Sequence, residues 1–213
     1  YVRGYRRKVV RKNLRNSFPE KSEKELKAIE KEFYANMCDY FVETIKYYGM
    51  SPEELRKHID FKGLDLLYHA IENGHSCVCY MLHTFNWEFV TSLPLFLKGE
   101  NIVAGAVYHK LRNARFDKIF RDMRAQYGAD NVDMKDTLRR IMTIVKDKKY
   151  FVYGFMADQL PKVEAMNHWV NFLNQDTAVF TGAEKIAQRV HASVFNLTLV
   201  KVGRGKYEGT FEL

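Results

Sequence analysis

The sequence predicts an α/β fold, with a mainly parallel central sheet flanked by helices and an N-terminal helical segment. From residue 61 onward, short apolar runs alternate with segments of helical periodicity, as in parallel sheets whose strands are joined by helices. Residues 1–60 carry helix signals and no convincing strand, so we expect a helical segment at 1–60 and an α/β domain at 61–213. The last two apolar runs flank Gly203-Arg204-Gly205, which predicts an antiparallel pair at the C-terminal edge of the sheet.

The first sixteen residues predict a basic helix. They hold seven Lys or Arg and no acid, and Arg3, Arg7, Arg11 and Arg15 recur every four residues along one helical face. Such a helix suits an anionic membrane surface or nucleic acid. The pattern is equally typical of the solvated face of an ordinary packed helix.

Two further helix starts follow within the N-terminal segment. Ser22 and Glu25 form a capping-box pattern, and apolar residues spaced by three and four continue to about Tyr47. Ser51 and Pro52 begin another helix, since serine is a favoured N-cap and proline suits the first helical position.

Beyond residue 60, glycines such as Gly74 and Gly128 mark helix ends, and short apolar runs mark strands. These patterns predict helices at 61–73, 87–97, 116–127, 133–147 and 184–191. They predict strands at 77–82, 101–108, 150–157, 193–202 and 206–213.

The net charge of +8 predicts an acidic partner, and its distribution is uneven. Residues 1–16 supply +7, which leaves only +1 for the other 197 residues. Hydrophobic residues make up 46% of the chain, enough for a sizeable core. The sequence therefore describes a nearly neutral domain that carries one strongly basic helix.

Several classes of site are missing from the sequence. The three cysteines, Cys38, Cys77 and Cys79, include one C-x-C and no second pair, so neither a disulfide framework nor a zinc site is expected. No run of 18 apolar residues occurs. Serine nucleophile elbows, phosphate-binding loops, zinc-protease motifs and dinucleotide fingerprints are also missing. No nucleic-acid motif occurs, and the thirteen Tyr are spread out, so nucleic acid is not an expected partner.

The strongest candidate for chemistry is His83, which follows the apolar run 77–82 directly. It should lie at the carboxyl edge of the sheet, where α/β proteins bind ligands. Glu88, five residues on, is placed to accept a hydrogen bond from one ring nitrogen and make the other a better base. A His and a Glu at this spacing also arise often by chance, with a purely structural role.

Four blocks of sequence carry a resemblance to a known family. H-x-x-x-x-E within HTFNWE, after Gly74-His75, resembles the first motif of the lipid A biosynthesis acyltransferases, in the lysophospholipid acyltransferase superfamily. The basic opening resembles the segment that follows the family's single membrane-spanning helix. The remaining blocks are Val107–Asn113 with Phe116, Asp117 and Arg124, then Ala157-Asp158-Gln159 with Pro161, and then Phe180-Thr181-Gly182 with Lys185-Ile186-Ala187. Thr84-Phe85 departs from the family's small, often glycine-containing pair, and His109-Lys110 departs from its usual basic residue and proline.

The resemblance implies a glycerol-3-phosphate acyltransferase-like fold and transfer of a fatty acyl group from a thioester to a hydroxyl of a lipid A precursor. The donor would be acyl carrier protein or acyl-CoA, and a thioester is activated enough to need no cofactor. His83 would act as general base, oriented by Glu88. A lysophospholipid or glycerolipid acceptor would use the same pair.

Further residues are expected to bind substrate or to shape the site. Arg112 and Arg124 are candidates for the acceptor's phosphates, or for surface ion pairs. The other candidates, each with a structural alternative, are Asn86, Asp158, Gln159, Thr181 and Gly182. The family also implies the cytoplasmic face of the bacterial inner membrane, with residues 1–16 on the anionic surface and a membrane anchor upstream of Tyr1.

Overall fold

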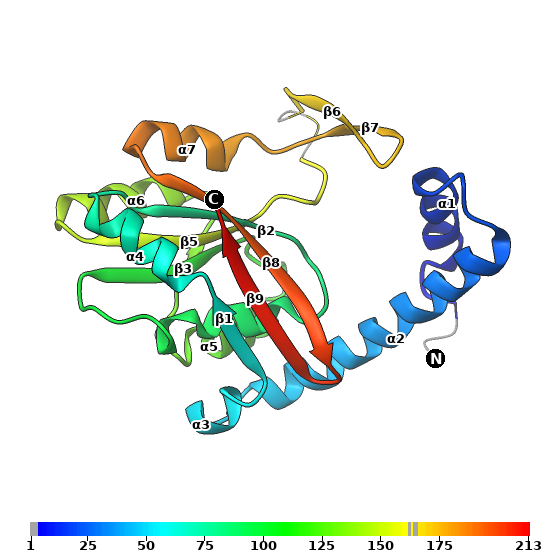
Figure 1. The fold of residues 1–213 in the computed structure, drawn as a ribbon, viewed down its shortest axis with the longest axis horizontal. Coiled ribbons are helices and arrows are strands. Elements are labelled where there is room, and N and C mark those ends of the chain that lie inside the picture. The colour runs from blue at the N-terminus through cyan, green and yellow to red at the C-terminus, as the bar shows by residue number, and fades with distance from the viewer. Residues whose placement is uncertain (1–3, 162, 164–165) are drawn as a thin grey trace. The chain divides into compact units, whose positions relative to one another are not determined.

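The computed structural model describes residues 4–161, 163 and 166–213 (Figure 1). The helices are α1 (Arg7–Ser17), α2 (Glu23–Tyr47), α3 (Pro52–Leu55), α4 (Leu64–Glu72), the 3₁₀ helix η1 (Trp87–Leu95), α5 (Ala114–Ala125), α6 (Thr137–Lys146) and α7 (Gly182–Val190). The strands are β1 (Ile59–Lys62), β2 (Cys77–Met81), β3 (Ile102–Tyr108), β4 (Asp130–Asp133), β5 (Tyr150–Met156), β6 (Trp169–Phe172), β7 (Gln175–Ala178), β8 (Ser193–Gly203) and β9 (Lys206–Glu212). In the described part of the chain, no helix is long and apolar enough to cross a bilayer.

Seven strands form one mixed sheet in the order β1-β9-β8-β2-β5-β3-β4. Within this sheet β2 and β5 pair parallel with each other and with their other neighbours, and β8 and β9 form its one antiparallel pair, the long pair in Figure 1. The predicted α/β class and mainly parallel sheet are therefore confirmed. The antiparallel pair does not form the edge, because β1 covers β9 as a parallel outer strand.

The sheet buries both faces, and strand alternation assigns each residue to one of two cores. On β2, Cys77, Cys79 and Met81 face a core built with α4, η1 and the end of α5, while Val78 faces a second core built with α6 and α7. A strand buried on both sides reads as a continuous apolar run, which is why C-V-C-Y-M was recognisable in the sequence.

Some expected boundaries were wrong. Residues 61–62, expected to begin a helix, belong to β1, and α4 begins only at Leu64. Because β1 starts at Ile59, the expectation of no strand before residue 60 is also wrong, and the expected boundary between the two parts falls within β1. The short strands β4, β6 and β7 were not predicted. Each has only four residues and mixes polar with apolar side chains.

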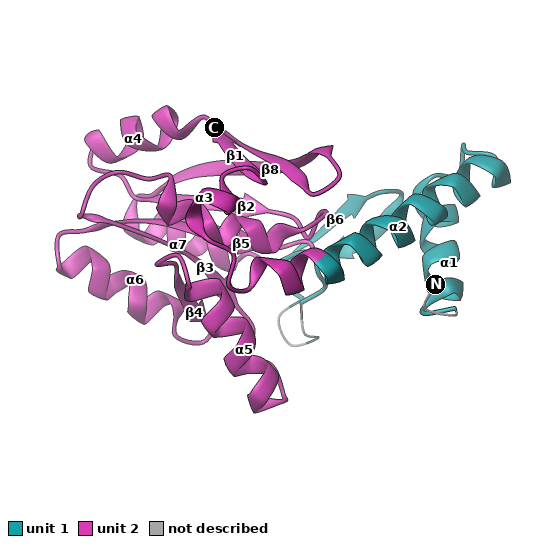
Figure 2. Ribbon diagram, turned by 90° about the horizontal axis from the view of Figure 1, so that it is seen from below, with its two compact units in different colours: residues 1–42, 159–180 teal, residues 43–158, 181–213 magenta. Residues whose placement is uncertain are grey.

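The chain forms two compact units (Figure 2). One contains residues 43–158 and 181–213, with the seven-stranded sheet and its helices. The other contains residues 1–42 and 159–180, with α1, most of α2 and the β6–β7 hairpin. The carboxyl edge of the sheet lies in the larger unit, and the hairpin and α1 lie in the smaller unit.

Candidate active site

The carboxyl ends of two neighbouring parallel strands bring His83 and Asp158 together. Met81 on β2 pairs with Met156 on β5, and His83 and Asp158 each lie two residues beyond this pair. The Nδ1 atom of His83 is 2.6 Å from Oδ1 of Asp158, and the backbone N–H of His83 donates to Oδ2 at 2.9 Å. One carboxylate therefore fixes both the ring and the backbone of His83.

This contact indicates which ring nitrogen of His83 carries the proton. A carboxylate only accepts hydrogen bonds, so Nδ1 carries the proton and Nε2 remains the acceptor. The side chains of His83 and Asp158 are 27% and 26% exposed, which leaves the pair within reach of a substrate. The Trp87 ring stands edge-on to the imidazole, with ring centres 4.9 Å apart, and limits its rotation. The arrangement suits removal of a proton from a bound hydroxyl.

Glu88 lies in the first turn of η1, fully buried, and its carboxylate is held by Arg124 of α5. The guanidinium donates through two nitrogens, from Nε to Oε2 at 2.7 Å and from Nη2 to Oε1 at 2.6 Å. Arg124, considered above for a substrate phosphate, therefore neutralises a buried charge and ties α5 to η1. The hydrogen bond expected between Glu88 and His83 stays a prediction.

Asn86 lies in the loop between His83 and η1, and it is fully buried. Its Nδ2 donates to Oε2 of Glu43 at 3.3 Å, and the same oxygen accepts from the Tyr207 hydroxyl at 2.6 Å. Its Oδ1 is buried with no hydrogen-bond partner in the described part of the chain. The loop also contains Phe85 at φ 48°, a left-handed conformation that side chains other than glycine rarely adopt. Through its hydrogen bond to Glu43, Asn86 thus anchors the strained loop that follows the candidate base, His83.

Arg112 follows β3, which is the neighbour of β5 in the sheet, so it reaches the same carboxyl edge. The loop around it is fixed by Asn113, whose side chain accepts from two backbone N–H groups at the start of α5, and by Asp117, which accepts from the N–H of Leu111 at 2.8 Å. Arg112 is exposed and makes no ion pair with any described residue. It is therefore available to an anionic ligand.

The last three predicted residues are Thr181, Gly182 and Gln159. Thr181 and Gly182 start α7, where Thr181 is half-buried and Gly182 is exposed. Thr181 is the N-cap of this helix, and the binding role expected for the pair stays a prediction. Gln159 is exposed and belongs to the smaller unit. None of the three has a described side-chain contact with His83 or Asp158.

The chain matches the family described as bacterial lipid A biosynthesis acyltransferase over residues 1–212. It belongs to this family. Two curated proteins are similar over 147 residues: lipid A biosynthesis acyltransferase 2 of Shigella flexneri, 24% identical, and lipid A biosynthesis myristoyltransferase of Escherichia coli K12, 22% identical. Both matches cover 69% of this chain, and they cover 45% and 44% of the relatives. The chain thus spans about half the length of the curated relatives it matches.

Membership in the lipid A acyltransferase family confirms the resemblance drawn from the four sequence blocks. The structure adds a pairing that the sequence analysis missed, namely Asp158 with His83. From the sequence, Asp158 was expected only to bind substrate or to shape the site. His83 and Asp158 lie the same number of residues beyond the paired Met81 and Met156, and this identifies Asp158 as the partner of His83. The relationship can be recognised only once β2 and β5 are known to be neighbours.

The two buried cysteines of β2 are not activated as nucleophiles. Burial raises the pKa of Cys77 to about 12 and that of Cys79 well above its ordinary value, so both thiols stay protonated at neutral pH. In the described residues, no group of three or more His, Cys, Asp or Glu is arranged to hold a metal ion. The contact of His83 with Asp158 has a geometry that suits proton transfer.

A small apolar cavity of about 20 Å³ lies between η1 and the sheet. Its lining includes Met81, Trp87, Gly105, Gly154 and Met156. It connects the Trp87 ring, which packs on His83, to the ends of β2 and β5. A volume near that of one or two water-sized spheres is too small for a fatty chain without movement of its walls.

The predicted basic helix forms as α1, but its repeated arginines are paired. Arg7 and Arg11 contact Glu30 of α2 at 2.7 and 2.8 Å, and Arg15 contacts Glu23 at 2.8 Å. Arg3, the first member of the repeat, lies outside the described residues. This face of α1 is therefore directed at α2, and α1 has no buried residue.

Proposed function

We propose that this chain transfers a fatty acyl group from a thioester to a hydroxyl of a lipid A precursor, with His83 as general base. The observation that carries the proposal is the contact of His83 with Asp158 at the carboxyl edge of a parallel sheet. Family membership supplies the reaction class. The donor we propose is acyl carrier protein, with acyl-CoA as the alternative.

In the proposed reaction, Nε2 of His83 takes the proton of the acceptor hydroxyl as its oxygen attacks the thioester carbonyl. The tetrahedral intermediate then expels the thiolate, which takes the proton back from the imidazolium, so an ester forms and a thioester breaks. Asp158 stabilises the imidazolium between these steps. Backbone N–H groups at the start of η1 are our candidates for holding the developing oxyanion.

Glu88 keeps a role in this proposal, now with two parts. The first part, expected from the sequence, is that Glu88 orients His83. The second is that its ion pair with Arg124 fixes the first turn of η1, which contains Trp87 and follows the loop after His83. Arg112 is the residue we propose for an acceptor phosphate, because it is exposed at the same edge and makes no ion pair with a described residue. Roles for Asn86, Gln159, Thr181 and Gly182 in binding substrate rest on the family resemblance alone.

We also propose that α1 rests on the anionic, cytoplasmic surface of the inner membrane. With Arg7, Arg11 and Arg15 paired, the basic side chains left for lipid headgroups are Arg6, Lys8 and Lys12, which are exposed. Each basic residue near an anionic leaflet contributes about 1 kcal/mol of binding free energy.

The decisive experiment is incubation of the chain with acyl carrier protein and coenzyme A thioesters and with lipid A precursor and lysophospholipid acceptors, followed by mass spectrometry of the products. We expect acylated lipid A precursor, and we expect His83→Ala to abolish it while the protein stays folded. His168→Ala, an exposed histidine without an assigned role, is the matched control. Full activity of His83→Ala would overturn the proposed base, whereas acylation of lysophospholipid alone would change the acceptor and keep the base.

A further inference from the structure

The β6–β7 hairpin exposes large apolar side chains on both of its faces. Trp169 is 56% exposed, Phe172 55% and Leu173 43%, and all four residues of β6 are exposed. Alternation along the strand puts Trp169 on one face and Val170 with Phe172 on the other. The apolar side chains of β6 are therefore exposed on both faces of the hairpin.

Such a hairpin is costly in water. An isolated two-stranded hairpin is marginally stable, and a group of exposed apolar residues marks a surface that binds something. The tip is a tight turn in which Leu173 and Asn174 have φ of 51° and 59°, so Leu173 is held outward at a conformation unusual for its residue type. The hairpin presents apolar residues at its end instead of the polar residues common in turns.

The hairpin is tied to the basic helix of the same unit. The side chain of Asn174 donates to the Ser17 carbonyl at 3.2 Å, and Asn16 donates to the Gln175 side chain at 3.1 Å. Gln175 also donates to the Ser17 hydroxyl at 3.4 Å. These contacts join the turn to the C-terminal end of α1, so apolar tip and basic helix belong to one surface element.

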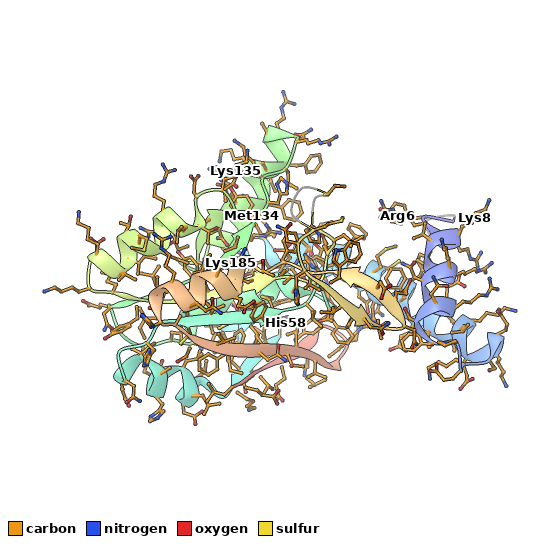
Figure 3. The ribbon with its side chains drawn as sticks, turned by 90° about the horizontal axis from the view of Figure 1, so that it is seen from above. Arg6, Lys8, His58, Met134, Lys135 and Lys185 are labelled. Atoms are coloured by element: carbon orange, nitrogen blue, oxygen red, sulfur yellow. The ribbon has the colours of Figure 1, made fainter. Side chains whose placement is uncertain are left out.

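The α1 helix and the hairpin together carry a net positive charge. Figure 3 shows Arg6 and Lys8 projecting from α1, and these two and Lys12 form no ion pair with any described residue. The ten residues from Trp169 to Ala178 contain one acid, Asp176, and no base. Cationic side chains on the helix that the hairpin contacts, together with exposed Trp, Phe and Leu on the hairpin, complement the headgroups and the upper acyl region of an anionic bilayer.

We propose that the β6–β7 hairpin inserts its tip into the interfacial layer of an anionic membrane, next to α1. The proposal rests on the membrane contact proposed for α1 and extends it from surface charge to apolar insertion. A second copy of the chain or a protein partner would not use the cations of α1 in the same way, because each would need its own acidic surface opposite them. The bilayer supplies both chemistries in one layer.

The test uses the chain's own fluorescence, since its only tryptophans are Trp87 and Trp169. Vesicles of phosphatidylglycerol with phosphatidylethanolamine are titrated into the protein while emission and sedimentation with the vesicles are recorded. We expect a blue shift of the emission on binding that is lost in Trp169→Phe, although this variant still sediments with the vesicles. Acyl transfer is not measured, so the result is independent of the proposed reaction.

The variant Phe172→Ser/Leu173→Ser should weaken vesicle binding by about tenfold or more, since two apolar side chains no longer leave water. The matched control is Val202→Ser, an apolar residue 64% exposed in the larger unit, which should bind as the parent does. Lys8→Gln/Lys12→Gln should reduce binding mainly at low salt. Bound protein whose Trp169 emission does not move would overturn the proposal. So would a blue shift that depends on protein concentration without vesicles, which would identify a second copy as the occupant.

Discussion

Asp158 holds His83 by two hydrogen bonds, one to the imidazole Nδ1 and one to the backbone N–H. The two residues are 75 positions apart in the sequence, and they meet because β2 and β5 are parallel neighbours that end in register. An imidazole attached in this way has little freedom in its ring orientation. The contact also keeps the proton on Nδ1, which a base acting through Nε2 requires.

We predict that Asp158→Asn lowers kcat for acyl transfer by roughly 10²–10⁴-fold, with little change in KM. An asparagine has a similar shape, but it does not stabilise the imidazolium with a negative charge. Steady-state kinetics measure the effect, and a urea titration checks that the variant is folded. Asp60→Asn, at an exposed position on β1, is the control and should keep the parent's kcat. Full kcat in Asp158→Asn together with none in Glu88→Gln would instead assign the orienting role to Glu88.

The ion pair of Glu88 with Arg124 leads to a prediction about stability. Arg124→Met leaves a carboxylate that is 1% exposed without its cation, and we expect a loss of about 3 kcal/mol in the free energy of unfolding. Lys118→Met, on the same helix, removes an exposed pair with Asp122 and should cost less than about 1 kcal/mol. Chemical denaturation compares the two variants.

The double variant Glu88→Gln/Arg124→Met provides the check on this explanation. It removes both charges, so it should recover part of the stability lost in Arg124→Met. If Arg124→Met and Lys118→Met lowered the free energy of unfolding equally little, the Glu88–Arg124 pair would not be what holds η1 in place.

Gly105 on β3 allows the close approach of β4. A Cβ atom at this position would lie 1.8 Å from the backbone oxygen of Asp130, its partner in the parallel pair. Neither strand backbone can move away without breaking the ladder, so we predict that Gly105→Ala lowers the free energy of unfolding by about 3 kcal/mol or more. Thermal unfolding measures it.

The matched control for this glycine is Gly182→Ala at the start of α7. A Cβ atom there meets nothing within 4 Å, so the variant should be unchanged or up to about 1 kcal/mol more stable. A Gly105→Ala protein as stable as Gly182→Ala would mean that β3 and β4 adjust freely, contrary to the register observed.

The sheet edge was predictable because its signals are local. An apolar run buried on both faces ends at Met81, and His83 must then project at the carboxyl edge, where Asp158 also belongs. Which carboxylate reaches the imidazole was not predictable, since that depends on strand order. Glu88 is near in sequence and Asp158 is near in space. Likewise, the pairing of Arg124 with Glu88 depends on α5 packing against η1, a contact between segments 36 residues apart.

Short strands were missed for a different reason. The four residues of β1 have the alternating pattern of an edge strand, but they follow a helix start and contain two charged residues. All four residues of β6 are exposed and β7 buries only Ala178, so the sequence of the hairpin lacks the in-and-out pattern from which strands are predicted. The feature that made the hairpin hard to predict is the same exposure that supports its proposed membrane contact.

The attachment of α1 to α2 should depend on pH through Glu30. Hydrogen bonds from Arg11 and Arg7 lower the pKa of this carboxyl below its ordinary value. A carboxyl with a lowered pKa contributes its full stabilisation above the unfolded pKa of about 4.3, and the contribution is lost as the pH falls through the lower, folded value. We therefore predict that amide protection of α1 in hydrogen exchange, corrected for intrinsic rates, is constant from pH 7 to 5 and falls below about pH 4.

Glu30→Gln should reduce the protection of α1 at pH 7, and the difference from the parent should disappear as the pH falls, because acid removes the same charge. Added salt should lower the protection of α1 in the parent toward that in Glu30→Gln, since the side chains of Arg7 and Arg11 are about half exposed. Glu32→Gln is the matched control, an exposed position on the same helix with no ion pair among the described residues, and it should follow the parent at every pH. Equal protection of α1 in Glu30→Gln and the parent at pH 7 would show that contacts other than these ion pairs hold α1 to α2.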